Sequence, residues 1–202
     1  MGIISVDLFL TLDGVYQAPG GADEDREGGF AYGGWQGAFD DDESGEAIGA
    51  GIRRMDALLL GRKTYDIFAS YWPLHGDNWI GAKFNAMPKF VVSRTLTDPT
   101  WEGTTVLRDA ATDVPALKTR FDEIHVIGSG HLTRSLLAAD LVDRLNLFLY
   151  PVTFGTGKRL FSDGTGVPAA FTLAQPPQGF PKGATWLVYE RAGVPVTGVE
   201  MG

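Results

Sequence analysis

The chain has 202 residues, of which 44% are hydrophobic, 21% charged and 11% aromatic, so it can bury a full core as one generous domain or two small ones. Its formal charge of -8 argues against a general binder of nucleic acid or of anionic membranes, because both need a cationic face. The absence of cysteine excludes disulfides, thiolate nucleophiles and cysteine-based metal sites. The three histidines, His75, His125 and His131, are too widely separated for a histidine-rich site, so we expect no bound metal.

The amino-terminal segment MGIISVDLFLTLDG contains an apolar run, but it has no basic leader and no small-residue cleavage site. It therefore predicts a first strand rather than a signal peptide. No segment approaches the roughly 20 apolar residues of a membrane-spanning helix. We expect a cytoplasmic protein that binds neither nucleic acid nor membrane.

Eight segments have the composition of β-strands, and ALLLG, KFVVS and IHVIG among them are short continuous apolar runs. Such runs are typical of strands that are covered on both faces. The predicted strands are residues 3–10, 56–61, 89–93, 104–107, 123–128, 144–150, 171–175 and 185–191.

Helical patterns lie between these strands. The segment ESGEAIGAGIRRM places Ile48, Ile52 and Met55 on one face of a helix. The segments TYDIFASYW, TDVPALKTRF and HLTRSLLAADL predict three more helices, with Pro115 tolerated in the first turn of its helix. Strands that alternate with helices predict an α/β fold, in which helices cover both faces of a largely parallel sheet.

The carboxyl-terminal part departs from this alternation. The segment FTLAQ, the turn PPQGFPKG and the segment ATWLVYER predict an antiparallel hairpin that closes one edge of the sheet. Because we find no internal repeat and no long low-complexity linker, we expect a single domain over residues 1–192 and a loose tail over residues 193–202. Residues 16–42 predict a long, glycine-rich, acidic loop, and a loop of this kind is usually functional, disordered or a lid.

Polar residues and glycines follow three of the predicted strands. These stretches are Gly61-Arg62-Lys63-Thr64, Ser93-Arg94-Thr95 and Gly128-Ser129-Gly130. Each stretch taken alone can be an ordinary turn with solvated charges. In an open parallel sheet, however, ligands bind outside the carboxyl ends of the strands, where glycines and helix N-termini accommodate phosphate. Three such strand ends in one sheet indicate a shared anion site.

The segments LLLGRKTYDIF, KFVVSRTL and IHVIGSGHLTRSLLAADLVDRLNLFLYPVTFGTGKRLF, in this order, resemble the dihydrofolate reductase superfamily. The resemblance runs from about residue 3 to residue 191. It is greatest to the branch that contains the reductase domain of bacterial riboflavin biosynthesis, the RibD C-terminal domain. The first strand of this chain, followed by TLDGVY, also resembles the opening of that branch. It implies a three-layer αβα fold with a mixed, mostly parallel eight-stranded sheet that ends in an antiparallel hairpin. It also implies a homodimer, and the candidate surface is an exposed apolar edge formed by LNLFLYPV or the final hairpin.

The resemblance further implies that NADPH binds across the strand ends. Thr64 and the following backbone match the residues that hold the pyrophosphate, and Gly61, Arg62 and Lys63 belong to the same turn, whose basic residues approach the adenosine 2′-phosphate. The second element, which flanks the adenosine, corresponds to Ser93, Arg94 and Thr95. The glycine turn that passes the pyrophosphate and the nicotinamide, together with the start of the next helix, corresponds to Gly128, Ser129, Gly130, His131 and Leu132. Two cationic strand ends favour NADPH over NADH, because NADH lacks the additional phosphate.

The sequence gives weaker signals for the residues that bind the substrate. Asp13-Gly14 fits the family's S-x-D-G type of turn, with Thr11 where serine is usual, and Asp13 is either a turn former or a candidate for substrate binding and catalysis. We expect Tyr16, Trp35 and Phe39 either to stack on a flat heterocycle or to pack on the core. The acids at residues 40–43, Asp42 among them, either complement the dipole of the next helix or supply a catalytic carboxylate.

The leading hypothesis is an NADPH-dependent reductase that transfers a hydride to a C=N or C=O bond of a pyrimidine, a pterin or a related heterocycle. By resemblance it is similar to the 5-amino-6-(5-phosphoribosylamino)uracil reductases of the riboflavin pathway. One alternative is a non-catalytic NADPH- or nucleotide-binding protein of the same fold. Another is a protein that handles flavin or a different nucleotide in the same cleft.

Overall fold

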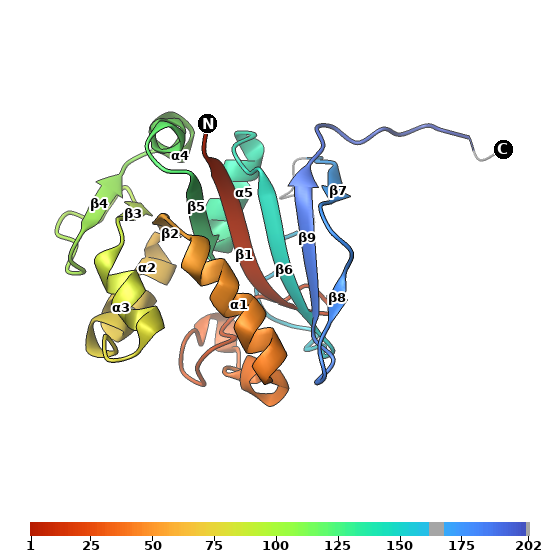
Figure 1. Ribbon diagram of the computed structural model, residues 1–202, viewed down its shortest axis with the longest axis horizontal. Coiled ribbons are helices and arrows are strands. Elements are labelled where there is room, and N and C mark those ends of the chain that lie inside the picture. Colours follow the sequence, from red (N-terminus) through yellow and green to blue (C-terminus); the bar gives the residue numbers. More distant parts are fainter. Residues whose placement is uncertain (162–167, 201–202) are drawn as a thin grey trace.

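The structure is a computed structural model that describes residues 1–161 and 168–200. Within these residues, nine strands form one mixed sheet in the order β4-β3-β2-β5-β1-β6-β9-β7, and β8 pairs with β9 (Figure 1). The strands are β1 Ile3–Thr11, β2 Ala57–Gly61, β3 Lys89–Val92, β4 Thr104–Leu107, β5 Glu123–Ile127, β6 Arg144–Tyr150, β7 Phe171–Leu173, β8 Gln178–Gly179 and β9 Thr185–Arg191.

Helices cover both faces of the sheet. The α-helices are α1 Asp42–Arg54, α2 Arg62–Tyr71, α3 Trp79–Ala86, α4 Ala110–Asp113 and α5 Gly130–Ala138. Short 3₁₀ helices occupy Glu27–Gly29, Trp35–Phe39, Trp72–Leu74 and Val114–Thr119. Figure 1 shows α1 crossing in front of the centre of the sheet, with α5 behind it.

The core is divided by the sheet because successive side chains of a strand point to opposite faces. Ile4, Val6, Leu8 and Leu10 of β1 belong to the cluster that includes residues of α4 and α5. On the opposite face, Leu58 and Leu60 of β2 pack with residues of α1, α2 and α3. A third cluster joins the end of β6 to the loop that follows β1. The faces of β1 thus differ, and its odd-numbered residues lie on the α1 side.

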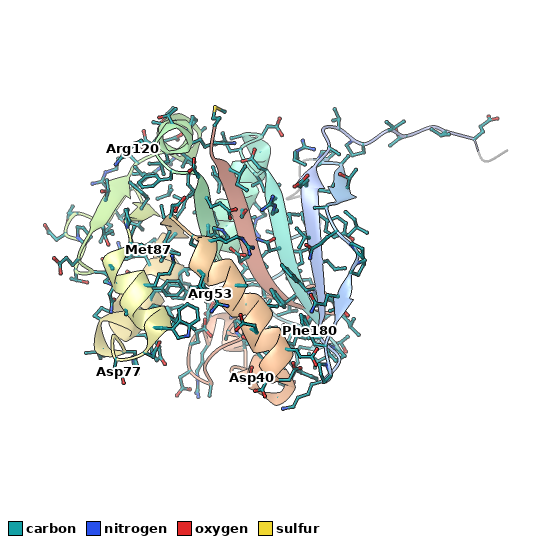
Figure 2. The ribbon with its side chains drawn as sticks, viewed as in Figure 1. Asp40, Arg53, Asp77, Met87, Arg120 and Phe180 are labelled. Atoms are coloured by element: carbon teal, nitrogen blue, oxygen red, sulfur yellow. The ribbon has the colours of Figure 1, made fainter. Side chains whose placement is uncertain are left out.

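The strands from β1 to β6 pair in parallel, so their carboxyl ends meet at one edge of the sheet, the lower edge in Figure 1. The loop that connects β1 to α1 lies at this edge (Figure 1). It ends in a helix cap, because the Asp41 side chain accepts a hydrogen bond from the Ser44 backbone N–H at 2.9 Å. Figure 2 shows Asp40 beside this end of α1 and Arg53 further along the helix, on the side of α3.

The predicted α/β fold, its mixed and mostly parallel sheet and its terminal antiparallel hairpin are confirmed. The hairpin is formed by β7 and β9, and β9 also pairs with β6. Two predicted details are wrong. The helix expected over residues 112–121 is a short α-helix, α4, followed by a 3₁₀ helix with Pro115 in its first turn. The segment LNLFLYPV is not an exposed edge, because β6 lies between β1 and β9.

One α-helix and one strand occur where the sequence pattern predicted neither, namely α3 and the two-residue strand β8. The segment WIGAKFNA of α3 has a glycine at its third position and apolar residues on several sides, so it shows no clear amphipathic pattern. Tertiary contacts stabilise it instead. The buried Lys89 Nζ donates hydrogen bonds to the backbone oxygens of Phe84, Asn85 and Met87 at 2.8–3.0 Å, at the carboxyl end of the helix.

Residues 193–200 carry no helix or strand, and Figure 1 shows this tail leading away from the sheet. Within the described part of the chain, no helix is both long enough and apolar enough to cross a membrane.

Candidate functional site

A cleft with a volume of about 1340 Å³ lies along the carboxyl edge of the parallel strands and continues beneath α1. Residues that follow β2, β3, β4 and β5 line its walls, and the loop after β1 lines its rim. All three predicted strand ends open into this one cleft. The lining residues that were predicted to bind a cofactor are Gly61, Arg62, Lys63, Thr64, Ser93, Arg94, Thr95, Gly128, Ser129, Gly130, His131 and Leu132.

Two helices begin at this cleft. Gly61 precedes α2 and Ser129 precedes α5, and in the described part of the chain neither helix has a side-chain cap at its N-terminus. The two starts are joined, because the Gly61 N–H donates a hydrogen bond to Ser129 Oγ at 2.9 Å. The remaining N–H groups and the helix dipoles favour an anion at both places.

The turn between β5 and α5 has an unusual backbone. Gly128 and Ser129 have φ angles of 59° and 52°, in the left-handed region that residues other than glycine rarely adopt. Gly130 must lack a side chain, because an added Cβ would lie 2.3 Å from Cζ of Tyr16. The ring of Tyr16 therefore covers the start of α5. Strained backbone of this kind is found preferentially at functional sites.

The third strand end is a loop held by its own polar groups. The Ser93 hydroxyl oxygen accepts hydrogen bonds from the backbone N–H groups of Thr95 and Leu96 at 3.3 and 3.1 Å. Arg108, which follows β4, donates hydrogen bonds from Nη1 to the backbone oxygens of Ser93 and Leu96 at 2.9 and 2.8 Å. These bonds leave Arg94 exposed beside the cleft, with no ion pair among the described residues.

The basic residues of the first strand end have carboxylate partners. Arg62 Nε donates to Asp66 at 2.8 Å within α2. Lys63 Nζ contacts both Asp25, at 2.7 Å, and Glu27. Lys158 Nζ contacts the same two carboxylates at 2.7 and 2.6 Å. This clamp, defined as Asp25, Glu27, Lys63 and Lys158, ties the loop after β1 to the rim of the cleft.

The ionic contacts of the clamp shift the pKa values of Asp25 and Lys63. Burial opposes the charge on Asp25, but hydrogen bonds from Lys158 and Lys63 lower its pKa below the usual value. Burial also opposes the charge on Lys63, but Asp25 and Glu27 raise its pKa above the usual value. Asp25 and Lys63 therefore stay charged at neutral pH, and ionic contacts hold the loop.

A polar array lies deeper in the cleft, on the face of the sheet that α1 covers. Asp7 of β1 accepts a hydrogen bond from Asn146 Nδ2 at 2.9 Å, and its other oxygen lies 2.6 Å from Nδ1 of His125. Asp7 and Asn146 line the cleft, whereas His125 is buried behind them. Burial opposes protonation of His125, but the charge of Asp7 and hydrogen bonds to Asp7 and Glu123 raise its pKa.

Comparison with known proteins shows the family of this chain. The sequence profile of the RibD C-terminal domain family matches residues 3–175. The chain belongs to the RibD C-terminal domain family. A match of this length covers every strand end described above.

Individual relatives agree with this assignment. The uncharacterized protein YyaP of Bacillus subtilis (strain 168) is 27% identical over 117 residues, which are 55% of this chain and 62% of that protein. The chain thus matches less than two thirds of its relative's length.

Two solved structures share the fold. One is a protein from Shewanella sp. PV-4 provisionally assigned to riboflavin biosynthesis, with a TM-score of 0.70, 21% identity and coverage of 94% of this chain and 99% of that one. The other is a pyrimidine reductase-like protein of Corynebacterium diphtheriae, with a TM-score of 0.60, 13% identity and coverage of 95% and 92%. At these identities the likeness shows the fold alone.

In this RibD-type domain, some of the residues predicted to bind substrate line the cleft and others do not. Tyr16 lines the cleft, and its burial raises the pKa of its hydroxyl group. Trp35 and Phe39 are not among the described residues that line the cleft. Trp35 is buried, donates from Nε1 to the Gln17 backbone oxygen at 2.8 Å and packs edge-on against Tyr150. Phe39 packs against the same tyrosine, so both aromatic rings support the loop.

The two carboxylates suggested as catalytic also lie outside the described lining of the cleft. Asp13 accepts hydrogen bonds from Thr11 Oγ1 at 2.6 Å, from the Gly155 N–H at 2.8 Å and from Arg159 Nη2 at 2.8 Å. Burial opposes its ionisation, but these bonds lower its pKa to about 2. Asp42 lies in the first turn of α1. Asp13 is therefore a turn anchor, and Asp42 complements a helix dipole.

Several residues of the cleft were not singled out from the sequence, namely Asp7, Arg108, Arg134, Asn146, Lys158 and Arg159. A charged residue in the apolar first strand was the one available signal for Asp7, because an acid is disfavoured at such a position unless it has partners. Among the described residues, no group of three or more His, Asp or Glu side chains could hold a metal ion.

Proposed function

We propose that this protein is an NADPH-dependent oxidoreductase that reduces a C=N or C=O bond of a pyrimidine, a pterin or a related heterocycle. The observation that carries the proposal is the convergence of two uncapped helix starts, α2 and α5, in one cleft. A dinucleotide has a pyrophosphate that needs this kind of surroundings, because free N–H groups and helix dipoles stabilise its charge.

The residues present fit the cofactor. The starts of α2 and α5 both line the cleft, and Thr64 adds a hydroxyl group there, with its Oγ1 3.9 Å from the place a Cβ on Gly128 would take. These residues would hold the pyrophosphate. Arg94 and Arg62, both exposed beside the cleft, would face the 2′-phosphate, with a forked geometry that suits phosphate.

When bound, NADPH supplies the hydride. The chain's own contribution is to orient the two reactants and to exclude water, which the loop after β1 does by covering the rim of the cleft through Lys63 and Lys158. The part of the cleft beneath α1 gives the heterocycle a place beside the strand ends.

The proposal is tested by following NADPH consumption with a panel of pterins and pyrimidines while NADPH binding is measured by calorimetry. We expect binding and turnover of at least one ring. Binding without turnover across the panel would favour the non-catalytic alternative. No binding at millimolar NADPH would contradict the proposal.

A further inference from the structure

The clamp at the rim of the cleft contains two carboxylates that differ in their surroundings. The Asp25 side chain is 10% exposed, whereas the Glu27 side chain is 62% exposed. Asp25 also accepts a hydrogen bond from the Glu27 backbone N–H at 3.0 Å, and its backbone oxygen accepts one from Gln17 Nε2 at 3.1 Å. Asp25 is therefore fixed within the loop, and Glu27 is the carboxylate of the clamp that solvent can reach.

Glu27 binds two cations through one oxygen atom. Its Oε2 lies 2.6 Å from Lys158 Nζ and also contacts Lys63 Nζ. Hydrogen bonds from Lys158 and Lys63 lower the pKa of Glu27, so this carboxylate is ionised at neutral pH. An exposed ion pair is weak, because water and salt screen it. Little free energy is therefore needed to separate Glu27 from the two lysines.

The backbone beside Glu27 suits such a movement. Gly28 and Gly29 follow it with φ angles of 68° and 77°, and a Cβ on either would meet no atom within 4 Å. Glycine accepts many backbone conformations, so this turn can rearrange without strain. The chain is fixed by Asp25 before the turn and by the buried Phe30 after it. The movement is therefore confined to one turn.

The two lysines lie where an anion is favoured. Lys63 is the second residue of α2, which has no acidic residue in its first turn and, in the described part of the chain, no side-chain cap at its N-terminus. The dipole of this helix adds to the attraction that the lysines exert on an anion. Lys63, Lys158 and Glu27 all line the cleft. Glu27 thus occupies a place that suits a phosphate group.

Charge decides whether Glu27 and a phosphate group can share the lysines. The clamp has two positive and two negative groups, so its formal charges cancel. When Glu27 leaves, two positive groups and one negative group remain, and the site becomes cationic. Phosphate carries more negative charge than a carboxylate and offers more acceptor oxygens to ammonium groups. A phosphate group therefore replaces Glu27 at the lysines rather than joining it.

We propose that Glu27 is an internal counter-anion, which holds the two lysines in the free protein and is replaced there by a phosphate group of the ligand. The ligand class is a nucleotide with a pyrophosphate group, and the inference rests on the proposed function for its identity as NADPH. Binding of the ligand releases the turn at Glu27, while Asp25 keeps the loop at the rim of the cleft. Glu27 thereby lowers the affinity for the ligand and couples the loop to binding.

The first test measures binding of inorganic pyrophosphate and of NADPH by calorimetry. Glu27→Gln keeps the size of the side chain and removes its charge, so it should bind both at least threefold more tightly than the wild-type protein does. Glu102→Gln is the matched control, because it changes the net charge equally and Glu102 is exposed outside the described lining of the cleft. It should bind both as the wild-type protein does.

The second test follows hydrogen exchange over residues 26–31 by mass spectrometry. Saturating pyrophosphate should speed exchange there in the wild-type protein, compared with sodium chloride at the same ionic strength. In Glu27→Gln, exchange should already be faster without pyrophosphate and should not rise further. A clamp that closes on the ligand would give the opposite result, namely slower exchange in the wild-type protein with pyrophosphate.

Weaker or unchanged pyrophosphate binding by Glu27→Gln, slower or unchanged exchange in the wild-type protein, or no binding of millimolar pyrophosphate would overturn the proposal. Failure of the proposed function gives a different pattern. If pyrophosphate binds and releases the turn while NADPH does not bind, the proposed function is contradicted and the role of Glu27 stands. If NADPH binds equally to the wild-type protein and to Glu27→Gln, the role of Glu27 is contradicted and the proposed function stands.

Discussion

Gly130 and Tyr16 show how single residues shape the cleft. The two come together because the loop after β1 passes over the start of α5, where a Cβ on residue 130 would lie 2.3 Å from Cζ of Tyr16. Real side chains do not approach this closely. The glycine therefore admits the tyrosine ring against the start of α5, a helix that has no side-chain cap among the described residues.

We expect Gly130→Ala to lower the free energy of unfolding by about 1–3 kcal/mol, which is the usual cost of overpacking. It should also weaken NADPH binding, because Tyr16 has to move. Urea denaturation and calorimetry measure the two effects. Gly45→Ala is the control, since Gly45 is exposed on α1 and its Cβ would meet no atom within 4 Å. If Gly130→Ala matched that control in both measurements, the contact with Tyr16 would be unimportant.

Asp13 is a second residue with a measurable role. Its pKa of about 2 is below the value of 3.8 for the unfolded chain, so the folded state releases its proton more readily. The resulting stability is fully present above the unfolded pKa and is lost as the pH falls from 3.8 toward 2.

Comparison of the wild-type protein with Asp13→Asn tests this role. The difference in unfolding free energy between the two proteins should decrease by about 2 kcal/mol as the pH is lowered from 5 to 2, on the order of 1.4 kcal/mol for each pKa unit. Denaturant titrations at several pH values give this difference. A difference that stays constant with pH would show that Asp13 is not held as an anion by Thr11, Gly155 and Arg159.

Among the structural elements, the loop after β1 is held by two kinds of contact. Its aromatic residues Phe30 and Trp35 pack into the core cluster at the end of β6. Its acids Asp25 and Glu27 pair with Lys63 of α2 and with Lys158. The clamp is nearer to solvent than the aromatic contacts, so it is the part of the attachment that salt and mutation can weaken first.

The double variant Asp25→Asn with Glu27→Gln should release the loop while the sheet stays intact. We expect faster hydrogen exchange over residues 20–34 and unchanged exchange in β1 and β5, measured by mass spectrometry. High salt should move the wild-type protein in the same direction. Asp77→Asn with Glu102→Gln is the control, because these two exposed acids lie outside the loop. Equal exchange in the two double variants would show that the clamp does not hold the loop.

For the molecule as a whole, the position of the cleft at the carboxyl ends of the strands was predictable, because parallel strands end on the same side of the sheet. The strand patterns ALLLG, KFVVS and IHVIG were correct, and the three polar stretches after them do line one cleft. The position of the cleft follows from local sequence and from general rules for α/β sheets.

The remainder depends on contacts between distant residues. Asp7 is 118 residues from His125 and 139 from Asn146, so the polar array exists because β1 lies between β5 and β6 in one register. The pairing of Lys63 with Glu27 spans 36 residues and depends on how an irregular loop folds. Trp35 and Phe39 could not be told from ligand-stacking residues, because burial against Tyr150 leaves no pattern in the sequence.

The dinucleotide site at the strand ends is the central claim, and paired titrations with NADPH and NADH test it most directly. The wild-type protein should bind NADPH more tightly than NADH. The double variant Arg62→Ala with Arg94→Ala should weaken NADPH binding at least tenfold and NADH binding less than threefold, if each lost phosphate contact is worth about 1.4 kcal/mol or more. Arg120→Ala is the control, since Arg120 lies at the opposite end of the sheet (Figure 2) and should change neither. Equal losses for both cofactors, or no binding of either by the wild-type protein, would contradict the account.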